Sequence, residues 1–468
     1  MLIFHFDSNF VQRSIPVAKA ILKEVSALGY NAVLWELEDQ VRWETCPECA
    51  QADSWSKEEF KELLAYSRGL GLEPIPLLQT VGHGEYVMKQ PAYRHFREDA
   101  GHSDCYCTYN PEVRAFLKRW LEEFVELFGS VKYFHMGGDE AWWFGSCPEC
   151  SRRKRGELYA EHIFDLAEVL LKHGIRPGVW GDMILKENML DVVPKSFVLW
   201  DWQYHVGAEG VFPTTDKLLA AGFDVFLCSS AKSVADSPFL PNATLHIPNL
   251  YGVNLKATRE AGVIGHCVTS WSIRQNLIDL AKPILEIPCL MTQKPGISYP
   301  EVRTALGKKY FGFENAFEAL EKLSAFDSGL RRYTGVQWDD LKDSVIPPAE
   351  MLRNRIAQWT KDQAPIWIKF EELLNELDAA HQTGLEMLRP YAKDFPMAAK
   401  WLKAGELQET FFALLRKAVL TPNAALVPFL EAHKQEVVDY LAVEETPASA
   451  RKNAELLLKP LRDFCQNA

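Results

Sequence analysis

The sequence has 468 residues, with 51 Lys and Arg against 63 Asp and Glu, and its formal net charge is −12. Hydrophobic residues make up 47% and charged residues 24%, which is ordinary globular usage and excludes a disordered or fibrous chain. No apolar run reaches the roughly 20 residues of a membrane-spanning helix, and no block of Lys and Arg favours nucleic-acid binding. The composition therefore predicts a folded protein with neither a membrane nor a nucleic acid as its partner.

The first residues, Met1–Asp7, read as a β-strand. They have neither the basic segment nor the cleavage site of a signal peptide. We therefore expect a cytoplasmic protein, and the ten cysteines agree with this location if they stay reduced.

The first two-thirds of the chain repeats one pattern, in which a helical stretch ends near a turn residue and a short β-rich run follows. The stretch Val17–Leu28, for example, stops at Gly29, a common residue after a helix end. Eight β-rich runs are found: Leu2–Phe6, Asn31–Leu37, Glu73–Gln79, Val131–Met136, Arg176–Trp180, Phe197–Trp200, Phe223–Cys228 and Val263–Thr269. Such alternation builds either a doubly wound sheet or a (β/α)₈ TIM barrel, and the count of eight favours the barrel.

From about Tyr310 onward the β-rich runs disappear, and helical periodicity replaces them. The segments with this periodicity are Glu350–Trp359, Pro365–Leu388, Ala398–Leu420 and Pro428–Leu441. We predict a catalytic barrel over residues 1–309 and a helical C-terminal domain over residues 310–468. The second domain would cap the barrel or form a homodimer interface.

Reactive side chains in such a barrel follow the C-terminal ends of the strands. At these positions the sequence gathers acidic residues and tryptophans, which suit a carbohydrate, because indole faces stack on sugar rings and carboxylates bind hydroxyls. Trp35 and Trp43 are expected to be packing residues instead. The predicted substrate-binding residues are Gln79, Trp180, Asp182, Trp200, Trp202, Tyr204 and Trp271.

Asp139 and Glu140 form the most specific pair among these positions. They follow a β-rich run and the glycines Gly137 and Gly138, whose missing side chains let backbone or ligand approach closely. Two adjacent carboxylates repel each other unless their tasks differ. The pair therefore suits one proton donor and one charge stabiliser.

The segment His135–Glu140 (HMGGDE) resembles the signature of glycoside hydrolase family 20, the β-N-acetylhexosaminidases. Leu37–Gln40 is similar to the acidic motif after the second strand of that family. Residues 76–87 are similar to the branch that contains hexosaminidase D. The resemblance covers about residues 1–300, and the order of its motifs along eight strands is its most specific feature.

The resemblance implies substrate-assisted retaining hydrolysis, in which the 2-acetamido group of the sugar attacks its own anomeric carbon. Glu140 would be the acid and base, and Asp139 would accept the acetamide N–H and stabilise the developing charge. His83 would tune the acid, and Asp39 would fix its ring. Trp180, Trp200 and Trp271 would line the pocket. Tyr204, or Tyr251 in its place, would donate to the acetamide oxygen.

One departure and two alternatives stay open. Asp7 and its neighbours stand where many family members have an arginine that holds sugar hydroxyls, so gluco- versus galacto-preference is undecided. A glycosidase using Glu140 with Glu36 or Asp182 on sugars without an acetamide is one alternative. A sugar-binding barrel that has lost catalysis is the other.

The segment Cys-Pro-Glu-Cys occurs twice, at Cys46–Cys49 and at Cys147–Cys150, and Cys105 and Cys107 lie between them. Two such knuckles can supply four thiolates to one tetrahedral zinc ion. We therefore predict no catalytic cofactor and a structural zinc held by Cys46, Cys49, Cys147 and Cys150. Reduced thiols without a metal, or disulfides, are the alternatives.

Overall fold

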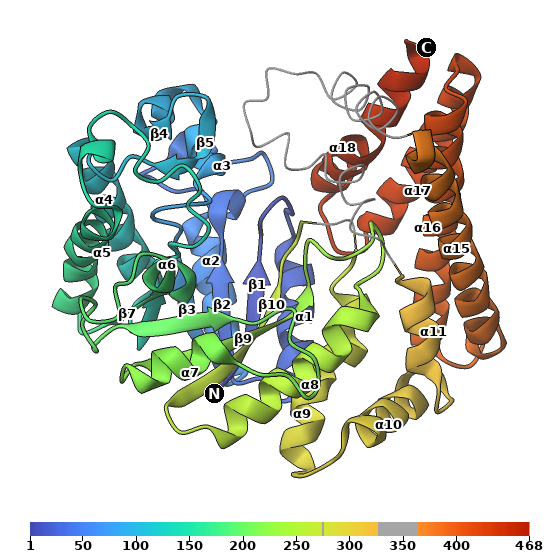
Figure 1. The fold of residues 1–468 in the computed structure, drawn as a ribbon, viewed down its shortest axis with the longest axis horizontal. Helices are drawn as coiled ribbons and strands as arrows, with labels where there is room; N and C mark the ends of the chain where they lie inside the picture. Colours follow the sequence, from blue (N-terminus) through green and yellow to red (C-terminus); the bar gives the residue numbers. More distant parts are fainter. Residues whose placement is uncertain (274–275, 326–363, 468) are drawn as a thin grey trace. The chain divides into compact units, whose positions relative to one another are not determined.

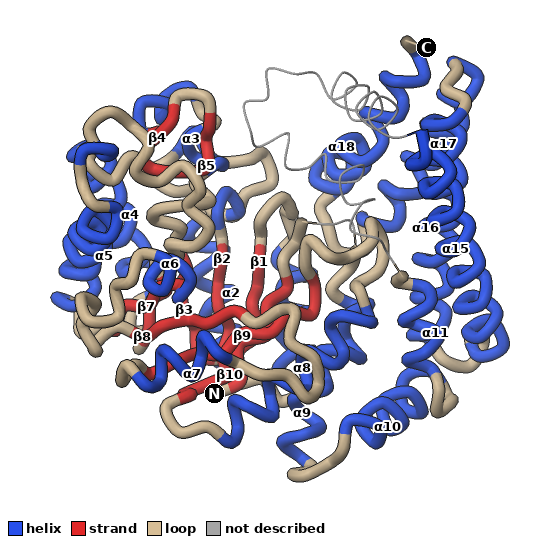
Figure 2. Tube along the Cα trace, in the orientation of Figure 1, coloured by secondary structure: helices blue, strands red, loops and turns tan. Residues whose placement is uncertain are grey.

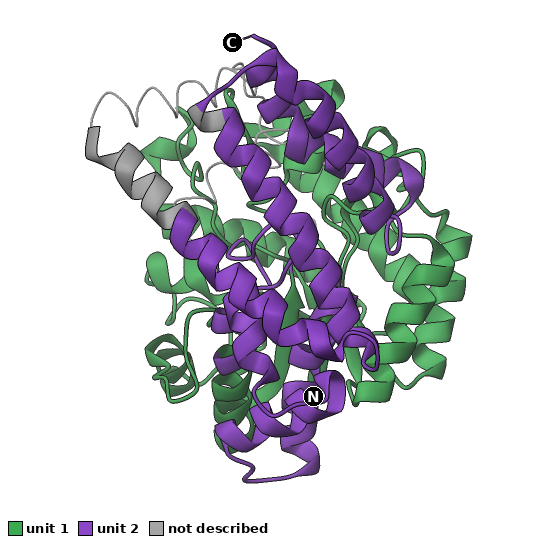
Figure 3. Ribbon diagram, turned by 90° about the vertical axis from the view of Figure 1, so that its right-hand side faces the viewer, with its two compact units in different colours: residues 1–230, 249–270, 341–343 green, residues 231–248, 271–340, 344–468 purple. Residues whose placement is uncertain are grey.

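The computed structural model describes residues 1–273, 276–325 and 364–467. They fall into two compact units (Figure 3). Of the described residues, unit 1 comprises 1–230 and 249–270, and unit 2 comprises 231–248, 271–273, 276–325 and 364–467. This division into units does not test the predicted domain boundary between residues 309 and 310, which stays a prediction.

Eight parallel strands form a closed barrel in the order β1-β10-β9-β8-β7-β6-β3-β2 (Figures 1 and 2). All eight predicted β-rich runs and the predicted barrel are confirmed. The strands are β1 (Leu2–Asp7), β2 (Ala32–Glu36), β3 (Glu73–Leu77), β6 (Tyr133–His135), β7 (Arg176–Trp180), β8 (Val198–Trp202), β9 (Asp224–Lys232) and β10 (Val263–Ser270).

The barrel strands read as continuous apolar runs because both faces of a parallel sheet are covered. Strand β2 is buried along its whole length and pairs with β1 and β3, so that Leu34 stands between His5 and Ile75. The ring centroid of Trp35 lies 4.9 Å from that of Phe6 and 5.4 Å from that of Phe60. Trp35 is therefore a packing residue, as predicted.

Helices alternate with the strands, and the predicted helix Val17–Leu28 is confirmed as α1. In unit 1, α1 packs against α2 and α4 against α5. A capping box starts α2: the Ser56 hydroxyl accepts the Glu59 N–H at 3.1 Å, and the Glu59 carboxylate accepts the Ser56 N–H at 2.7 Å. These helices are α1 (Ile15–Leu28), α2 (Lys57–Gly69), α4 (Pro111–Phe128) and α5 (Arg155–Lys172).

The connection between β3 and α4 carries structure that we did not predict. It contains a short helix, α3 (Glu85–Met88), and an antiparallel pair of strands, β4 (Arg97–Asp99) and β5 (His102–Tyr106). Strands this short give too few residues for the alternating pattern to be recognised.

Beyond β10, the described residues form helices joined by turns and loops. Three predicted segments are confirmed as α15, α16 and α17, and the fourth, Glu350–Trp359, lies outside the described residues. The helices are α9 (Lys282–Gln293), α10 (Tyr299–Phe311), α11 (Ala316–Leu323), α15 (Ala364–Leu388), α16 (Pro396–Leu420), α17 (Val427–Leu441) and α18 (Pro447–Gln466). Within the described ranges, no helix is both long enough and apolar enough to cross a bilayer.

Candidate active site

Asp139 and Glu140 are placed at the mouth of the barrel by the turn that ends β6. His135 Nδ1 accepts the Gly137 N–H at 2.9 Å, and the Gly137 carbonyl accepts the Trp180 N–H at 3.1 Å. Gly137 has a φ of 64°, and a Cβ there would lie 2.1 Å from Gln79 Oε1. Only glycine fits this turn, so the sequence Gly137-Gly138 sets where the acidic pair begins.

His83 reaches both carboxylates from the connection after β3. Its Nε2 lies 3.4 Å from Asp139 Oδ2 and 3.7 Å from Glu140 Oε2. The preceding residue, Gly82, allows this approach, because a Cβ there would lie 2.5 Å from the Asp139 carbonyl oxygen. The structure thus brings together the predicted acid, the predicted stabiliser and the predicted tuning histidine.

The backbone at this site is strained. His83 (φ 53°), Glu140 (φ 41°) and Glu38 (φ 40°) occupy the left-handed region, which non-glycine residues rarely adopt. Such strain costs on the order of 1–3 kcal/mol per residue and clusters at functional sites, where the surrounding structure enforces it. All three residues follow the C-terminal ends of barrel strands.

The surroundings of Glu140 and His83 shift the pKa values of both side chains upward, for different reasons. Burial raises the pKa of Glu140, the Asp139 charge raises it further, and His83 lowers it, with a net upward shift. Burial opposes the charged form of His83. The carboxylates of Asp139, Glu85 and Glu140 outweigh that effect and hold the pKa of His83 well above its usual value. His83 is therefore a cation near neutral pH, and Glu140 retains its proton to higher pH than an exposed glutamate.

Asp182, at the start of α6 (Gly181–Lys186), supports the pair from the next strand. Its Oδ2 accepts the Glu140 N–H at 3.1 Å. Burial and then the Asp139 charge raise the pKa of Asp182 to about 7. Its Oδ1 is buried and has no hydrogen-bond partner among the described residues, as is also true of Asp139 Oδ1. The described residues therefore leave two carboxylate oxygens of this group without a hydrogen-bond donor.

A second acidic group follows β1 and β2. Glu36 accepts hydrogen bonds from His5 Nε2 at 2.9 Å and from Gln79 Nε2 at 2.8 Å. Burial, followed by the charges of nearby carboxylates, raises the pKa of Glu38 well above its ordinary value. Gln79 is thus buried beside the acidic residues.

Asp39 Oδ1 accepts a hydrogen bond from Gln12 Nε2 at 2.8 Å. In the predicted relay from Asp39 through His83 to Glu140, the contact between Asp39 and His83 stays a prediction. The contact between His83 and Glu140 is present. Sequence reasoning missed Glu85, whose charge contributes to the raised pKa of His83. Its position two residues after His83 was the available signal.

The predicted aromatic residues lie at different depths. Trp180 and Trp200 are fully buried, with ring centroids 4.4 and 4.8 Å from that of His135. Trp202 and Tyr204 are half-buried and stack at 5.5 Å, so their faces are more accessible. The first pair therefore packs against His135 in the interior, and the second pair is more exposed.

Three other aromatic residues from the sequence predictions are also placed. Trp271 belongs to unit 2, where its N–H donates to the Lys232 carbonyl. Tyr251 is buried in unit 1, within α8 (Ala243–Arg259). Trp43 donates from Nε1 to the Glu38 carbonyl at 2.7 Å and stacks on Phe124, in agreement with its predicted packing role.

Comparison with known proteins adds an independent observation. Residues 19–242, which include the acidic pair and His83, match the sequence profile of the glycosyl hydrolase family 20 catalytic domain. This part of the barrel, residues 19–242, belongs to glycosyl hydrolase family 20. The similarity between HMGGDE and the family signature is therefore confirmed as a family relationship.

Curated relatives of this family 20 barrel include hexosaminidase D from Homo sapiens, which is 30% identical over 270 residues. That match covers 53% of this chain and 55% of the relative, about half the length of each. Hexosaminidase D from Bos taurus is 28% identical over 247 residues, 49% of this chain and 71% of the relative. These matches support the predicted hexosaminidase D-like branch.

Solved structures show the same fold at lower identity. A β-N-acetylhexosaminidase from Bacteroides fragilis has a TM-score of 0.53 at 18% identity, covering 66% of this chain and 70% of that chain. The exo-β-N-acetylglucosaminidase from Vibrio harveyi, solved with N-acetylglucosamine, has a TM-score of 0.51 at 16% identity. It covers 64% of this chain and 56% of that chain.

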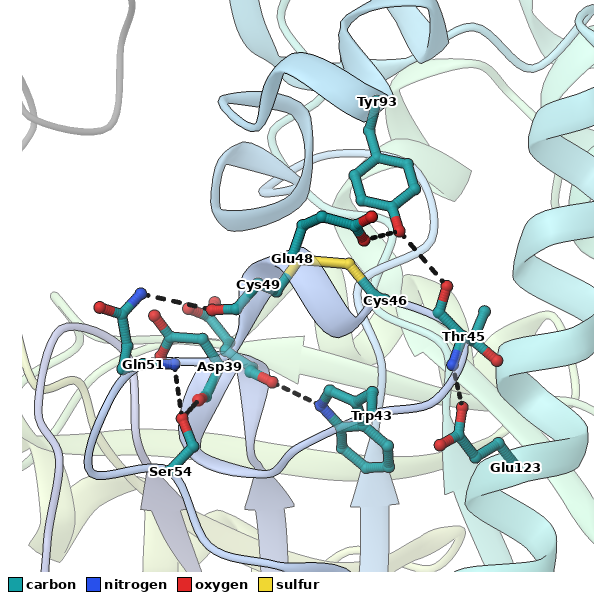
Figure 4. The surroundings of a disulfide bond; sticks show 11 residues. Asp39, Trp43, Thr45, Cys46, Glu48, Cys49, Gln51, Ser54, Tyr93 and Glu123 are labelled. Carbon is teal, nitrogen blue, oxygen red and sulfur yellow. Dashed lines mark hydrogen bonds between the residues drawn. A yellow bond between two sulfur atoms is a disulfide. The ribbon is translucent and has the colours of Figure 1, made fainter.

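The cysteines of the family 20 barrel are not arranged as predicted. Cys46 and Cys49 are joined in a disulfide in the loop after β2 (Figure 4), which is one of the alternatives to the predicted zinc ligands. Cys147 and Cys150 lie instead with Cys107 and the Glu98 carboxylate. The two Cys-Pro-Glu-Cys segments are equivalent in sequence, but tertiary structure gives them different partners.

The disulfide loop is held by its own contacts. Glu123 of α4 accepts the N–H groups of Glu44 and Thr45 at 2.6 and 2.9 Å. Tyr93 points toward the loop and donates to Glu48 at 2.5 Å (Figure 4). Ser54 donates to the Asp39 carbonyl at 2.5 Å. The loop is thus anchored on both sides of the disulfide.

Proposed function

We propose that this chain is an exo-β-N-acetylhexosaminidase that removes terminal N-acetylglucosamine or N-acetylgalactosamine by substrate-assisted retaining hydrolysis. One observation carries the proposal. The buried Oδ1 of Asp139 has no hydrogen-bond partner among the described residues, and Asp139 directly precedes a glutamate whose side chain is 41% exposed. A buried acceptor without a donor is costly. The N–H of a sugar acetamide would satisfy it beside a proton donor that reaches the solvent.

Glu140 supplies the proton in the first step. The acetamide oxygen of the bound sugar attacks the anomeric carbon, the bond from that carbon to the leaving oxygen breaks, and the leaving oxygen takes the Glu140 proton. The sugar is left as an oxazolinium ion. A raised pKa suits this role, because the acid must hold its proton at the working pH. In the second step Glu140 accepts a proton from the water that opens the ring.

Asp139 orients the nucleophile and does not attack. As an anion, it accepts the acetamide N–H, which aims the acetamide oxygen at the anomeric carbon. Positive charge develops on this amide in the transition state, and a fixed negative charge beside it lowers the barrier. His83 Nε2 lies 3.4 Å from the other oxygen of Asp139 and holds this side of the carboxylate away from the acetamide.

The names of the relatives, hexosaminidase D and β-N-acetylhexosaminidase, agree with this activity. The sequence predictions of a terminal N-acetylhexosaminide substrate, cytoplasmic localisation and a homodimer through the helical region are retained as part of the proposal. Size-exclusion chromatography with light scattering tests the last of these directly.

The decisive experiment compares substrates with the same leaving group. Initial rates are measured on the aryl β-glycosides of N-acetylglucosamine, N-acetylgalactosamine, glucose and galactose. We expect turnover only of the acetylated pair, since the nucleophile belongs to the substrate. A thiazoline analogue of the oxazoline intermediate should inhibit the enzyme strongly.

The alternatives predict different outcomes. Equal rates on acetylated and non-acetylated sugars, without thiazoline inhibition, would identify a glycosidase with two separate carboxylates, such as Glu140 with Glu36 or Asp182. Binding of the sugars without turnover of any of them would identify a sugar-binding barrel that lacks catalysis. The ratio between the two acetylated substrates gives the gluco- versus galacto-preference.

A further inference from the structure

Three thiols and one carboxylate converge in unit 1. Cys107 Sγ lies 3.8 Å from Cys147 Sγ and 3.9 Å from Cys150 Sγ, and Glu98 Oε2 lies 3.4 Å from Cys150 Sγ. One ligand atom from each of the four residues lies within 4.8 Å of all the others. Four side chains of metal-binding type therefore surround one point.

The spacing matches a tetrahedral metal. Thiolates bind zinc at about 2.3 Å, so two of them on one tetrahedral ion stand about 3.8 Å apart. The distances from Cys107 Sγ to the sulfurs of Cys147 and Cys150 have this value to within 0.1 Å. Bonded sulfurs of a disulfide would lie only about 2.0 Å apart, so the cluster does not have disulfide geometry.

The surroundings also suit a metal site. Cys150 and Glu98 are buried, and Cys107 and Cys147 are half-buried. The Cys150 N–H donates to Cys147 Sγ at 3.3 Å, and the Cys147 N–H donates to Glu98 Oε1 at 2.9 Å. Backbone N–H groups aimed at sulfur and carboxylate orient ligands and offset their negative charge. A buried carboxylate among thiols is costly unless a cation accompanies it.

We propose that Glu98, Cys107, Cys147 and Cys150 bind one structural zinc ion. The three thiols release their protons to solvent on binding, and three thiolates and one carboxylate fill the tetrahedron. No position is left for a reactive water, so the metal takes no part in hydrolysis. This ligand set replaces the one predicted from the two Cys-Pro-Glu-Cys segments, because Cys46 and Cys49 are paired with each other.

The site would connect the two segments that carry the acidic group. Glu98 and Cys107 lie on the connection between β3 and α4, which also holds His83. Cys147 and Cys150 lie on the connection between β6 and α5, which also holds Glu140. A metal bridging these connections would keep His83 against the carboxylates without touching the substrate.

The test begins with metal content of the full chain, purified with a non-chelating reductant and measured by mass spectrometry of the elements. We expect about one zinc per chain. Zinc competition titrations then compare Cys107→Ser and Cys150→Ser with two controls. The first control is Cys105→Ser, two residues from Cys107 but outside the cluster, and the second is the double variant Cys46→Ser with Cys49→Ser.

Both controls should retain the zinc. In the two ligand variants, the affinity for zinc should fall by more than roughly 10–100-fold, which is the loss typical of replacing a residue that only hydrogen-bonds to a metal ligand. Zinc that is lost from the Cys46 and Cys49 double variant but retained by Cys107→Ser would overturn the ligand set. Reduced wild-type protein that takes up no zinc on titration would overturn the site altogether.

A measurement on the wild-type chain does not depend on the folding of any variant. Cobalt(II) replaces zinc in such sites, and its thiolate charge-transfer absorption grows with the number of bound sulfurs. We expect a tetrahedral spectrum with the intensity of three thiolates. An octahedral spectrum, or the intensity of two or four thiolates, would contradict the proposal.

Discussion

Asp139 and Glu140 are neighbours in sequence but occupy different environments. The side chain of Asp139 is 10% exposed and that of Glu140 is 41% exposed, while His83 lies within 4 Å of both. The pKa of Glu140 is raised by burial and by the Asp139 charge. One carboxyl is therefore suited to orient a substrate group, and the other to exchange a proton with an oxygen near the mouth.

The substitution Glu140→Gln removes the proton donor while keeping shape and hydrogen-bonding capacity. On a substrate with a poor leaving group, such as a disaccharide, we expect the rate to fall by about 10²–10⁴-fold, the usual contribution of a general acid. On a dinitrophenyl glycoside, whose leaving group needs no proton, the fall should be much smaller. Glu149→Gln, on the same connection but exposed and paired with Arg152, is the control. Equal losses on both substrates would remove Glu140 from the role of acid.

The pH profile tests the charge of His83. Activity should decline at high pH as Glu140 loses its proton, because the first step requires the acid form. The charge of His83 lowers the pKa of Glu140, so His83→Asn should raise that pKa. The alkaline limb of kcat/KM should then move to higher pH. The control His95→Asn, an exposed histidine beside Glu112, should leave the limb in place. An alkaline limb that moves to lower pH in His83→Asn would contradict this electrostatic role.

Two barrel connections meet at the scale of secondary-structure elements. The one between β3 and α4 carries His83, and the one between β6 and α5 carries Asp139 and Glu140. The two connections are in contact at Gly82, where an added Cβ would lie 2.5 Å from the Asp139 carbonyl oxygen. Because Gly82 has no side chain, the two backbones approach each other directly.

The substitution Gly82→Ala should push the two connections apart. Because the obstructing atom belongs to the backbone, the clash cannot be relieved by a side-chain rotation, and we expect a loss of about 1–3 kcal/mol in stability. A displacement of about 1 Å at the carboxylates can lower kcat by about 10²-fold. Gly69→Ala, where no atom lies within 4 Å of the added methyl group, is the matched control. Chemical denaturation and steady-state kinetics measure both effects, and a Gly82→Ala variant with wild-type kcat would show that this contact does not position the acids.

At the scale of the whole molecule, unit 2 has its own buried polar contacts. Glu444, just after α17, accepts the N–H groups of Ile278 and Asp279 at 2.9 and 2.8 Å. Trp401 of α16 is fully buried and donates from Nε1 to the Leu280 carbonyl at 3.1 Å. Both contacts join residues more than a hundred positions apart and fix the start of α9 to the later helices of the same unit.

The substitution Glu444→Ala should destabilise unit 2. The buried N–H of Ile278 and the half-buried N–H of Asp279 lose a charged acceptor, and loss of a buried hydrogen bond of this kind costs on the order of 1–3 kcal/mol. We expect a lower midpoint of thermal unfolding, measured by circular dichroism and calorimetry. Glu406→Ala, an exposed glutamate within α16, is the control and should leave the midpoint within experimental error. An unchanged midpoint for Glu444→Ala would mean that water replaces the carboxylate at no cost.

Local sequence features were sufficient for the barrel and for the acidic pair. Apolar runs of strand length and the glycines after helices are properties of neighbouring residues, so all eight strands could be located. The antiparallel β4–β5 pair was missed because its strands are too short to show a period. Glu85 was missed although it lies within residues 76–87, because the resemblance of that segment assigned it no role. The acid motif Gly-Gly-Asp-Glu was recognisable, because its glycines are required by the turn itself.

The partners of residues far apart in the chain were decided by tertiary structure alone. Sequence spacing paired the two Cys-Pro-Glu-Cys segments with each other, whereas the folded chain joins Cys46 to Cys49 and sets Cys147 and Cys150 beside Cys107 and Glu98. Closure of the barrel brings β3 beside β6, although the chain between them carries another helix and a hairpin. A residue type and its immediate neighbours determine which chemistry a side chain can perform. Which side chains meet depends on the path of the backbone between them, which no local pattern encodes.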